Sequence, residues 1–175
     1  MNGNCHLVFG TACATMVAVN ITNVSLAFPN ITTTSEYITL LMLGGMVGGI
    51  LPDIDNPTSY VGRLTVPLST AIGRLSKAFG KTGANHRGVL HDFFVYVVGL
   101  FLSYNYFPSL VGVFIGALSH LYLDMFNPSG VPFCFGMKRI HLGKIKSGSK
   151  ESVIFTWANV LLVIIIGLLL RFKIT

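Results

Sequence analysis

The segment LMLGGMVGGILPDID, residues 41–55, decides how the rest of this chain is arranged. Its first part is apolar and rich in glycine, and Gly44 with Gly48 and Gly45 with Gly49 form two overlapping pairs of small residues four positions apart. A helix with such pairs can approach a neighbouring helix closely inside a membrane. Its second part, LPDID, ends the helix and carries two carboxylates. The segment therefore predicts a closely packed membrane helix that ends in acidic side chains.

The composition of the whole chain is that of a membrane protein. Of its 175 residues, 52% are hydrophobic and only 10% are charged, and the mean hydropathy is +0.69. The N-terminus, Met-Asn-Gly-Asn-Cys-His, lacks the positive region of a signal peptide, so we expect the first apolar run to be retained. Residues 1–175 are therefore predicted to form a single integral membrane domain.

Apolar runs predict an all-α, polytopic membrane helical bundle with about five transmembrane helices plus one interfacial amphipathic helix. The interfacial helix is predicted where apolar residues recur at helical spacing with basic residues elsewhere around the wheel. The five predicted spans are Leu7–Phe28, Tyr37–Leu51, Val89–Phe107, Leu110–Phe126 and Val153–Leu170, and the interfacial helix is Val61–Phe79.

Basic residues predict the orientation of this bundle. Threading the five spans through a bilayer puts the loops 52–88 and 127–152 on the same side as the N-terminus, and these loops carry ten of the twelve Lys and Arg residues. Arg171 and Lys173 lie on the other side. The positive-inside rule then makes the two loops cytoplasmic and the C-terminus external. The net charge of +6 therefore indicates membrane orientation, and no nucleic-acid partner is expected.

The same threading brings most of the histidines and acidic residues to one depth. They stand where apolar spans begin or end on the cytoplasmic side. The set consists of His6, Asp53, Asp55, His86, His91, Asp92, His120 and Asp124. Ionisable side chains are costly at the ends of apolar spans and tend to be functional there, so this convergence predicts a metal site.

Residue types and spacings also suit a metal. His120 and Asp124 are four residues apart and share a helix face, so one ion can bind both. Asp53 and Asp55 follow a proline, and two such carboxylates repel each other unless a cation lies between them. Histidine and aspartate without cysteine favour Zn²⁺, or alternatively Mn²⁺ or Fe²⁺. The set can support one or two ions with an open position for water.

Each motif also has a simpler reading. His6 can be a capping or interfacial residue, the Asp53 and Asp55 pair can be carboxylates at a helix end, and His91 with Asp92 can be a hydrogen-bonded second layer around a site. His141 stands beside basic residues and reads as a solvated loop residue. The three cysteines form no C-x-x-C pair and read as small buried hydrophobic residues.

The ordered motifs resemble the YdjM-type family of bacterial and archaeal inner-membrane, metal-dependent hydrolases. The resemblance covers nearly the whole chain and is carried by Pro52-Asp53-Ile54-Asp55, His86-Arg87-Gly88-x-x-His91, Ser119-His120-x-x-x-Asp124, Asn127-Pro128-x-Gly130-Val131 and Lys146-Ser147-Gly148-Ser149-x-Glu151. Members usually have Thr-His-Ser where this chain has Leu90-His91-Asp92, so Asp92 can be an added ligand or base where the Ser of other members would be a hydrogen-bonding residue.

In motif order the family is similar to zinc-dependent phospholipase C and the fungal single-strand nucleases, helical enzymes that cleave phosphoesters with clustered His and Asp. That likeness implies that the metal ligands are His6, Asp53 with Asp55, one of His86 and His91, and His120 with Asp124. It implies a membrane-bound hydrolase that cleaves a phosphoester of a lipid or lipid-linked substrate at the cytoplasmic face of the inner membrane.

Roles for the remaining residues follow from the chemistry of phosphate. Arg87 is suited to a bidentate grip on a phosphate group, and Arg139 can approach from the second loop. Asp92, or whichever of Asp53 and Asp55 is not a ligand, can serve as general base. A basic rim at a bilayer surface favours an anionic amphiphile such as a phospholipid or polyprenyl phosphate.

Two other functions compete with the hydrolase. Polar groups in membrane spans often mark ion paths, which favours a divalent metal-ion transporter. Transporters, however, tend to place their sites at the bilayer midplane between repeats, and this chain shows ligands at one end of its spans and no repeat. The second alternative is a non-enzymatic lipid-binding protein with a structural metal, which would lack an open coordination position.

Overall fold

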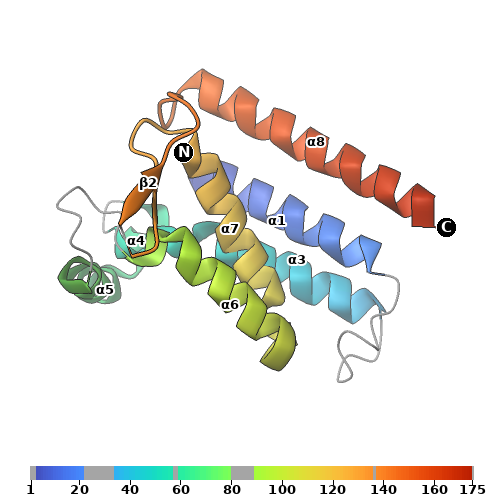
Figure 1. Cartoon of the computed structure of the whole chain (residues 1–175), viewed down its shortest axis with the longest axis horizontal. Coiled ribbons are helices and arrows are strands. Elements are labelled where there is room, and N and C mark those ends of the chain that lie inside the picture. Colours follow the sequence, from blue (N-terminus) through green and yellow to red (C-terminus); the bar gives the residue numbers. More distant parts are fainter. Residues whose placement is uncertain (1–2, 22–33, 57–58, 80–88, 136, 175) are drawn as a thin grey trace.

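The computed structural model describes residues 3–21, 34–56, 59–79, 89–135 and 137–174. It is mostly helical, and Figure 1 shows the long helices running side by side while the shorter elements gather at the end that holds the N-terminus. The long helices are α1 (Gly3–Asn20), α3 (Thr34–Ile50), α6 (Phe93–Tyr106), α7 (Val111–Met125) and α8 (Lys150–Ile174). The other helices are η1 (Leu51–Asp55), α4 (Tyr60–Leu64), α5 (Val66–Phe79), η2 (Val89–His91) and η3 (Pro108–Leu110).

The predicted helical bundle is confirmed in outline. Within the described residues, three stretches are long and apolar enough to cross a membrane, namely Ser35–Asp55, Pro108–Met125 and Lys150–Phe172. Helix α6 is apolar but shorter, with 14 residues, and α1 has 18. The predicted number of five spans therefore stays a prediction, and part of the first predicted span lies outside the described residues.

A short β-hairpin corrects the all-α prediction. Strands β1 (Val131–Phe133) and β2 (Lys138–Ile140) pair in antiparallel fashion in the loop between α7 and α8, with Val131 opposite Ile140. The β-branched Val131 is fully buried against the core, and that contact anchors the hairpin. Short strands of three residues lack the alternating pattern that would have identified them in the sequence.

The predicted interfacial helix Val61–Phe79 is divided into α4 and α5 at Thr65. Pro67 has no N–H group to donate in a continuous helix, so the chain ends one helix and starts another. The apolar side chains of Leu64, Val66 and Leu68 are exposed. These two helices lie beside the short elements at the N-terminal end of the molecule (Figure 1).

The glycine pairs of α3 let it lie directly against two helices. A Cβ atom at Gly48 would collide with the carbonyl oxygen of Val113 on α7, whereas a Cβ atom at Gly49 would collide with the carbonyl oxygen of His6 on α1. Gly44 faces α7 and Gly45 faces α1 in the same way. The predicted close approach is therefore confirmed, and the two pairs face two different neighbours.

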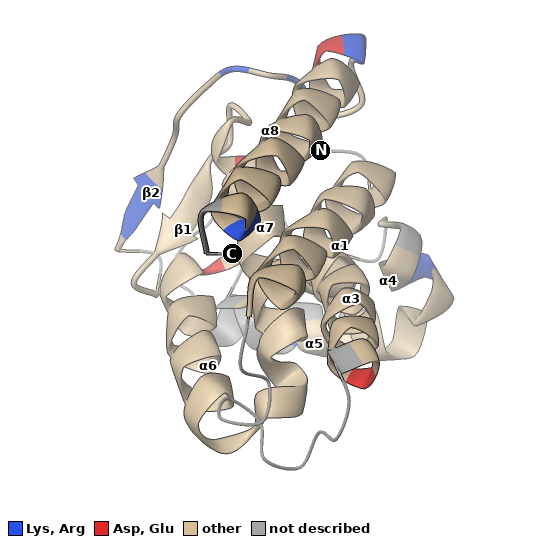
Figure 2. Ribbon diagram, turned by 90° about the vertical axis from the view of Figure 1, so that its right-hand side faces the viewer, with Lys and Arg blue, Asp and Glu red and all other residues tan. Residues whose placement is uncertain are grey.

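The outer surface of the bundle is apolar, as expected for contact with lipid. Helix α8 exposes Trp157, Leu161 and Leu169, and in Figure 2 the bodies of the helices are almost free of charged residues. Lys and Arg in that view lie on β2, on the loop that leads to α8 and near helix ends. A surface of this kind is stable in a bilayer because the helical backbone satisfies its own hydrogen bonds.

Replacing one of these glycines should separate two helices. We expect Gly48→Ala to lower the stability of the protein in detergent by about 1–3 kcal/mol, because the added methyl group forces α3 away from the α7 backbone. Val47→Leu, which enlarges the neighbouring exposed side chain of α3, should have little effect. Thermal unfolding of both variants tests this, and equal midpoints would show that the contact is not tight.

Candidate metal centre

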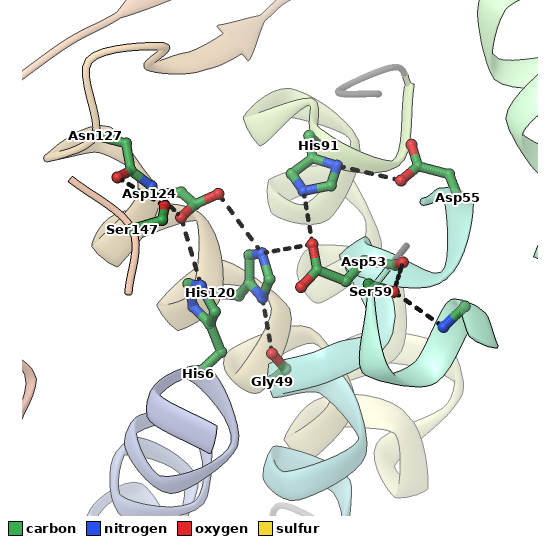
Figure 3. A network of polar contacts seen from close by, with 11 residues as sticks. His6, Gly49, Asp53, Asp55, Ser59, His91, His120, Asp124, Asn127 and Ser147 are labelled. Carbon is green, nitrogen blue, oxygen red and sulfur yellow. Dashed lines mark hydrogen bonds and ion pairs between the residues drawn. The ribbon is translucent and has the colours of Figure 1, made fainter. Parts of the chain in front are cut away.

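Six of the predicted ligands meet at one end of the bundle. His6 comes from the first turns of α1, Asp53 and Asp55 from η1, His91 from η2, and His120 and Asp124 from the last turns of α7. Figure 3 shows their side chains pointing toward one another from these four elements. The loop between α3 and α4 reaches the site because Pro52 ends α3 and tightens the chain into the 3-10 turn η1.

The first group of ligands joins α1 to α7. One ligand atom each of His6, His120 and Asp124 lies within 4.8 Å of the others. His6 Nε2 is 3.4 Å from Asp124 Oδ1, and His120 Nε2 is 3.8 Å from Asp124 Oδ2. The rings of His6 and His120 are stacked with centroids 3.6 Å apart. All three side chains are buried, so these polar atoms have no access to bulk water.

The second group joins η1, η2 and α7. Ligand atoms of Asp53, His91 and His120 lie within 4.8 Å of one another. Asp53 Oδ1 is 3.5 Å from His91 Nε2 and 3.8 Å from His120 Nε2, while the other nitrogen of His91, Nδ1, is 3.7 Å from Asp55 Oδ1. Asp55 therefore flanks this group through His91.

His120 belongs to both groups, and its environment fixes its tautomer. Its Nδ1 is 2.7 Å from the carbonyl oxygen of Gly49, which can only accept, so Nδ1 carries the proton. Nε2 therefore presents a lone pair, and it is buried without a hydrogen-bond partner among the described residues. A backbone carbonyl that holds one imidazole nitrogen while the other is left free is the usual support for a metal-binding histidine.

Asp124 is held by a residue to which the sequence analysis assigned no role. The side-chain amide of Asn127 donates to Asp124 Oδ1 at 2.8 Å, and Ser147 Oγ donates to Asn127 Oδ1 at 3.1 Å. Both contacts appear in Figure 3. In the sequence, the only indication of this contact is that Asn127 follows Asp124 by three residues, a separation at which two side chains can meet. These bonds leave Asp124 Oδ2 directed at His120.

The two carboxylates near His91 change its protonation. Burial by itself lowers the pKa of His91, but the carboxylates of Asp53 and Asp55 outweigh that effect and raise its pKa to about 9. Without a bound cation, the His91 imidazolium therefore offsets part of the negative charge of the site at neutral pH. A metal ion at this position would take the place of that proton.

The other predicted site residues lie in different settings. Asp92 is the N-cap of α6, where its carboxylate accepts the N–H of Phe94 at 3.0 Å, and it belongs to neither ligand group. Arg139 on β2 donates through Nε to the carbonyl oxygen of Ser129. His141 is exposed, as predicted. His86 and Arg87 lie outside the described residues.

The donor set fits a divalent ion with nitrogen and oxygen ligands. The two groups together hold three imidazoles and two carboxylates, and Asp55 adds a third carboxylate beside His91. No cysteine belongs to either group, and carboxylates this close repel one another unless a positive charge lies between them. The buried lone pair of His120 points between Asp53 and Asp124. Because it is a single lone pair, it can bind an ion in only one of the two groups at a time.

Access to the site is from the Asp53 side. The side chain of Asp53 is 24% exposed, against 2% for Asp55 and 3% for Asp124. Water or a substrate group can therefore reach Asp53 and the ligand atoms beside it, whereas the first ligand group is closed over by α1 and α7.

Comparisons with known proteins identify relatives that match about half of this chain. Inner membrane protein YdjM of Escherichia coli (strain K12) is 36% identical over 91 residues, which cover 47% of this chain and 42% of that protein. The uncharacterized protein YvsG of Bacillus subtilis (strain 168) is 31% identical over 99 residues, which cover 55% of this chain and 57% of that protein.

The chain thus spans about half the length of the curated relatives it matches. No solved structure matches it. A family model described as YdjM inner membrane protein matches residues 1–174, which is almost the whole sequence. The apolar helices, the buried His and Asp cluster at their end and this match lead to one conclusion: the chain is a membrane protein of the YdjM family.

Proposed function

We propose that this protein is a membrane-bound metal-dependent hydrolase that cleaves a phosphoester of a lipid or lipid-linked substrate at the cytoplasmic membrane face. The observation that carries the proposal is the buried Nε2 of His120, which lies 3.8 Å from carboxylate oxygens of both Asp53 and Asp124 and has no hydrogen-bond partner among the described residues. An orphan lone pair between two carboxylates costs free energy unless a cation occupies the place.

Zinc is the metal we propose, with manganese or iron as alternatives, because the donors are imidazole and carboxylate. The residues that would hold it are His6, His120 and Asp124 in the first group, and Asp53 and His91 with His120 in the second. When bound, such an ion makes water a stronger nucleophile near neutral pH and stabilises negative charge on phosphoryl oxygens. One ion in either group is compatible with this arrangement, as are two ions of which only one binds His120.

The side chains supply the rest of the reaction. Asp53 is the most exposed carboxylate of the site and is not a ligand when the ion occupies the first group, so in that state we assign it as the base that accepts a proton from the attacking water. The water oxygen then bonds to phosphorus, the ester P–O bond breaks, and the leaving alkoxide takes up a proton from solvent. Asp92 is less suited to this role because its carboxylate caps α6. Arg87, with Arg139 as a second candidate, would grip the phosphoryl oxygens.

A lipid substrate is the part of the proposal that rests on the position of the site. The ligands lie at the ends of apolar helices, where a lipid phosphate is found in a bilayer, and Lys and Arg lie on the neighbouring loops (Figure 2). A site for moving ions across the bilayer is expected nearer its midplane. The hydrolase is therefore favoured over the transporter.

Loss of a ligand should remove the metal. We expect Asp124→Ala and His120→Ala to abolish stoichiometric zinc binding, because each change takes a donor atom from the buried group. His141→Ala serves as the matched control, since that histidine is exposed. Metal analysis of the purified proteins measures the outcome. Equal metal content in all three variants would refute the assignment.

The reaction itself tests the proposal most directly. The purified protein should release product from a phospholipid or polyprenyl phosphate and stop when a chelator is added. Arg87→Lys should keep the metal but turn over about a hundredfold more slowly, because Lys cannot make the paired hydrogen bonds and one such contact contributes roughly 3 kcal/mol. Arg171→Lys, the same change near the far end of α8, should be silent.

Two results would contradict the hydrolase. One is that no phosphoester is cleaved at any metal loading while liposomes containing the protein admit divalent ions, which would support the transporter. The other is that the metal is bound and neither cleavage nor transport occurs, which would support a structural metal.

The cytoplasmic orientation can be tested by cysteine labelling in intact cells. In a background with the native cysteines replaced, Lys146→Cys in the loop before α8 should resist a membrane-impermeant thiol reagent, because the basic loops face inward. Asn105→Cys near the opposite end of α6 should react, since the exposed end of that helix faces outward. The reverse pattern would overturn the orientation.

A further inference from the structure

Tyr96 lies against the turns of α7 that carry the ligands. It is on α6, one turn after the helix N-cap, and its ring packs in a buried cluster with Leu121, Met125 and Val131. Leu121 and Met125 directly follow His120 and Asp124 in the sequence. Tyr96 is only 3% exposed, so its position is fixed by this packing.

The hydroxyl group of Tyr96 is a buried polar group that lacks a hydrogen-bond partner among the described residues. The carboxylates of Asp55 and Asp53 act electrostatically on this hydroxyl, and Asp53 belongs to the second ligand group. Asp55 Oδ1 is itself buried without a hydrogen-bond partner among the same residues. Buried hydroxyl groups are nearly always paired in native proteins, so this one requires a partner.

We propose that the Tyr96 hydroxyl is a catalytic residue that donates a hydrogen bond to a phosphoryl oxygen of the substrate. The inference rests on the proposed function, because an anionic oxygen can approach Asp53 and Asp55 only when a cation neutralises them. A neutral phenol is a hydrogen-bond donor that does not compete with the imidazoles for the ion. It can therefore hold the phosphoryl group beside the ion and stabilise the charge that builds up during attack.

A structural alternative makes opposite predictions. If an ordered water links Tyr96 to Asp55, removing the hydroxyl deletes a hydrogen bond and destabilises the protein without affecting phosphate. If the hydroxyl forms a hydrogen bond only when substrate is bound, removing it deletes a buried polar atom that has no partner in the free protein. The protein then becomes equally stable or more stable but binds phosphate less well.

Tyr96→Phe and Tyr122→Phe separate these cases, because both remove one phenolic oxygen. The Tyr122 hydroxyl has a protein partner, since it donates to Asn159 Oδ1 at 3.0 Å, so its loss should lower the thermal midpoint and leave phosphate binding unchanged. For Tyr96→Phe we expect full zinc content, an equal or higher midpoint, and phosphate affinity about tenfold weaker, as for one hydrogen bond to a charged group.

The measurements are zinc analysis, thermal unfolding and calorimetric titration of the zinc-loaded full-length protein with orthophosphate. A second titration with dodecyl phosphate in the same detergent distinguishes a lipid phosphate from a soluble one. Tighter binding of dodecyl phosphate, with the same tenfold loss in Tyr96→Phe, supports the contact and assigns it to a lipid. The loss with orthophosphate alone supports the contact and assigns it to a soluble phosphate.

Three outcomes overturn the role of Tyr96. If both variants bind phosphate as the wild type does, the proposed role of the Tyr96 hydroxyl is refuted, whereas the proposed hydrolase function is not. If Tyr96→Phe loses zinc or is destabilised as Tyr122→Phe is, its hydroxyl is structural. If the zinc-loaded wild type binds neither phosphate, the role of Tyr96 fails together with the proposed function.

Discussion

The close packing of α3 between α1 and α7 is the constraint on which the rest of the structure depends. Gly48 and Gly49 bring the α3 backbone against carbonyl oxygens of both neighbours. The same approach lets the carbonyl oxygen of Gly49 reach Nδ1 of His120 across the helix interface. A contact made for packing thereby sets the tautomer of a side chain in the site, which links the stability of the bundle to its chemistry.

The candidate site buries polar side chains at one end of an apolar helical bundle. The free energy needed to remove water from these side chains restricts the arrangements that are stable there. Buried imidazoles and carboxylates lose their hydration, and no set of ion pairs at 3.4–3.8 Å recovers all of that free energy. A cation bound among them would offset part of that cost. The hydrogen bonds from Asn127 and Ser147 then have a clear purpose, because they fix the carboxylate of Asp124 before any ion arrives.

The loop between α7 and α8 also contributes more than a connection. Its hairpin covers the cluster around Tyr96, and Ser147 ties the segment before α8 to the ligand Asp124 through Asn127. Movement of this loop would therefore change the position of the Asp124 carboxylate.

The sequence by itself determined the membrane character, the glycine-lined helix and the six candidate ligands that meet in the structure, because hydropathy, small-residue spacing and ionisable groups at span ends are local properties that a linear pattern records. It missed the β-hairpin, whose strands are too short for a periodic signal, and the division of the predicted interfacial helix into α4 and α5.

Only the tertiary structure decided that Asp92 caps a helix, that Asn127 holds Asp124, and that His120 serves both ligand groups. It also left the hydroxyl of Tyr96 buried without a hydrogen-bond partner among the described residues and under the electrostatic influence of Asp55 and Asp53. These facts depend on contacts between residues far apart in the chain or on the backbone conformation at one residue, and spacing along the sequence does not determine either of them.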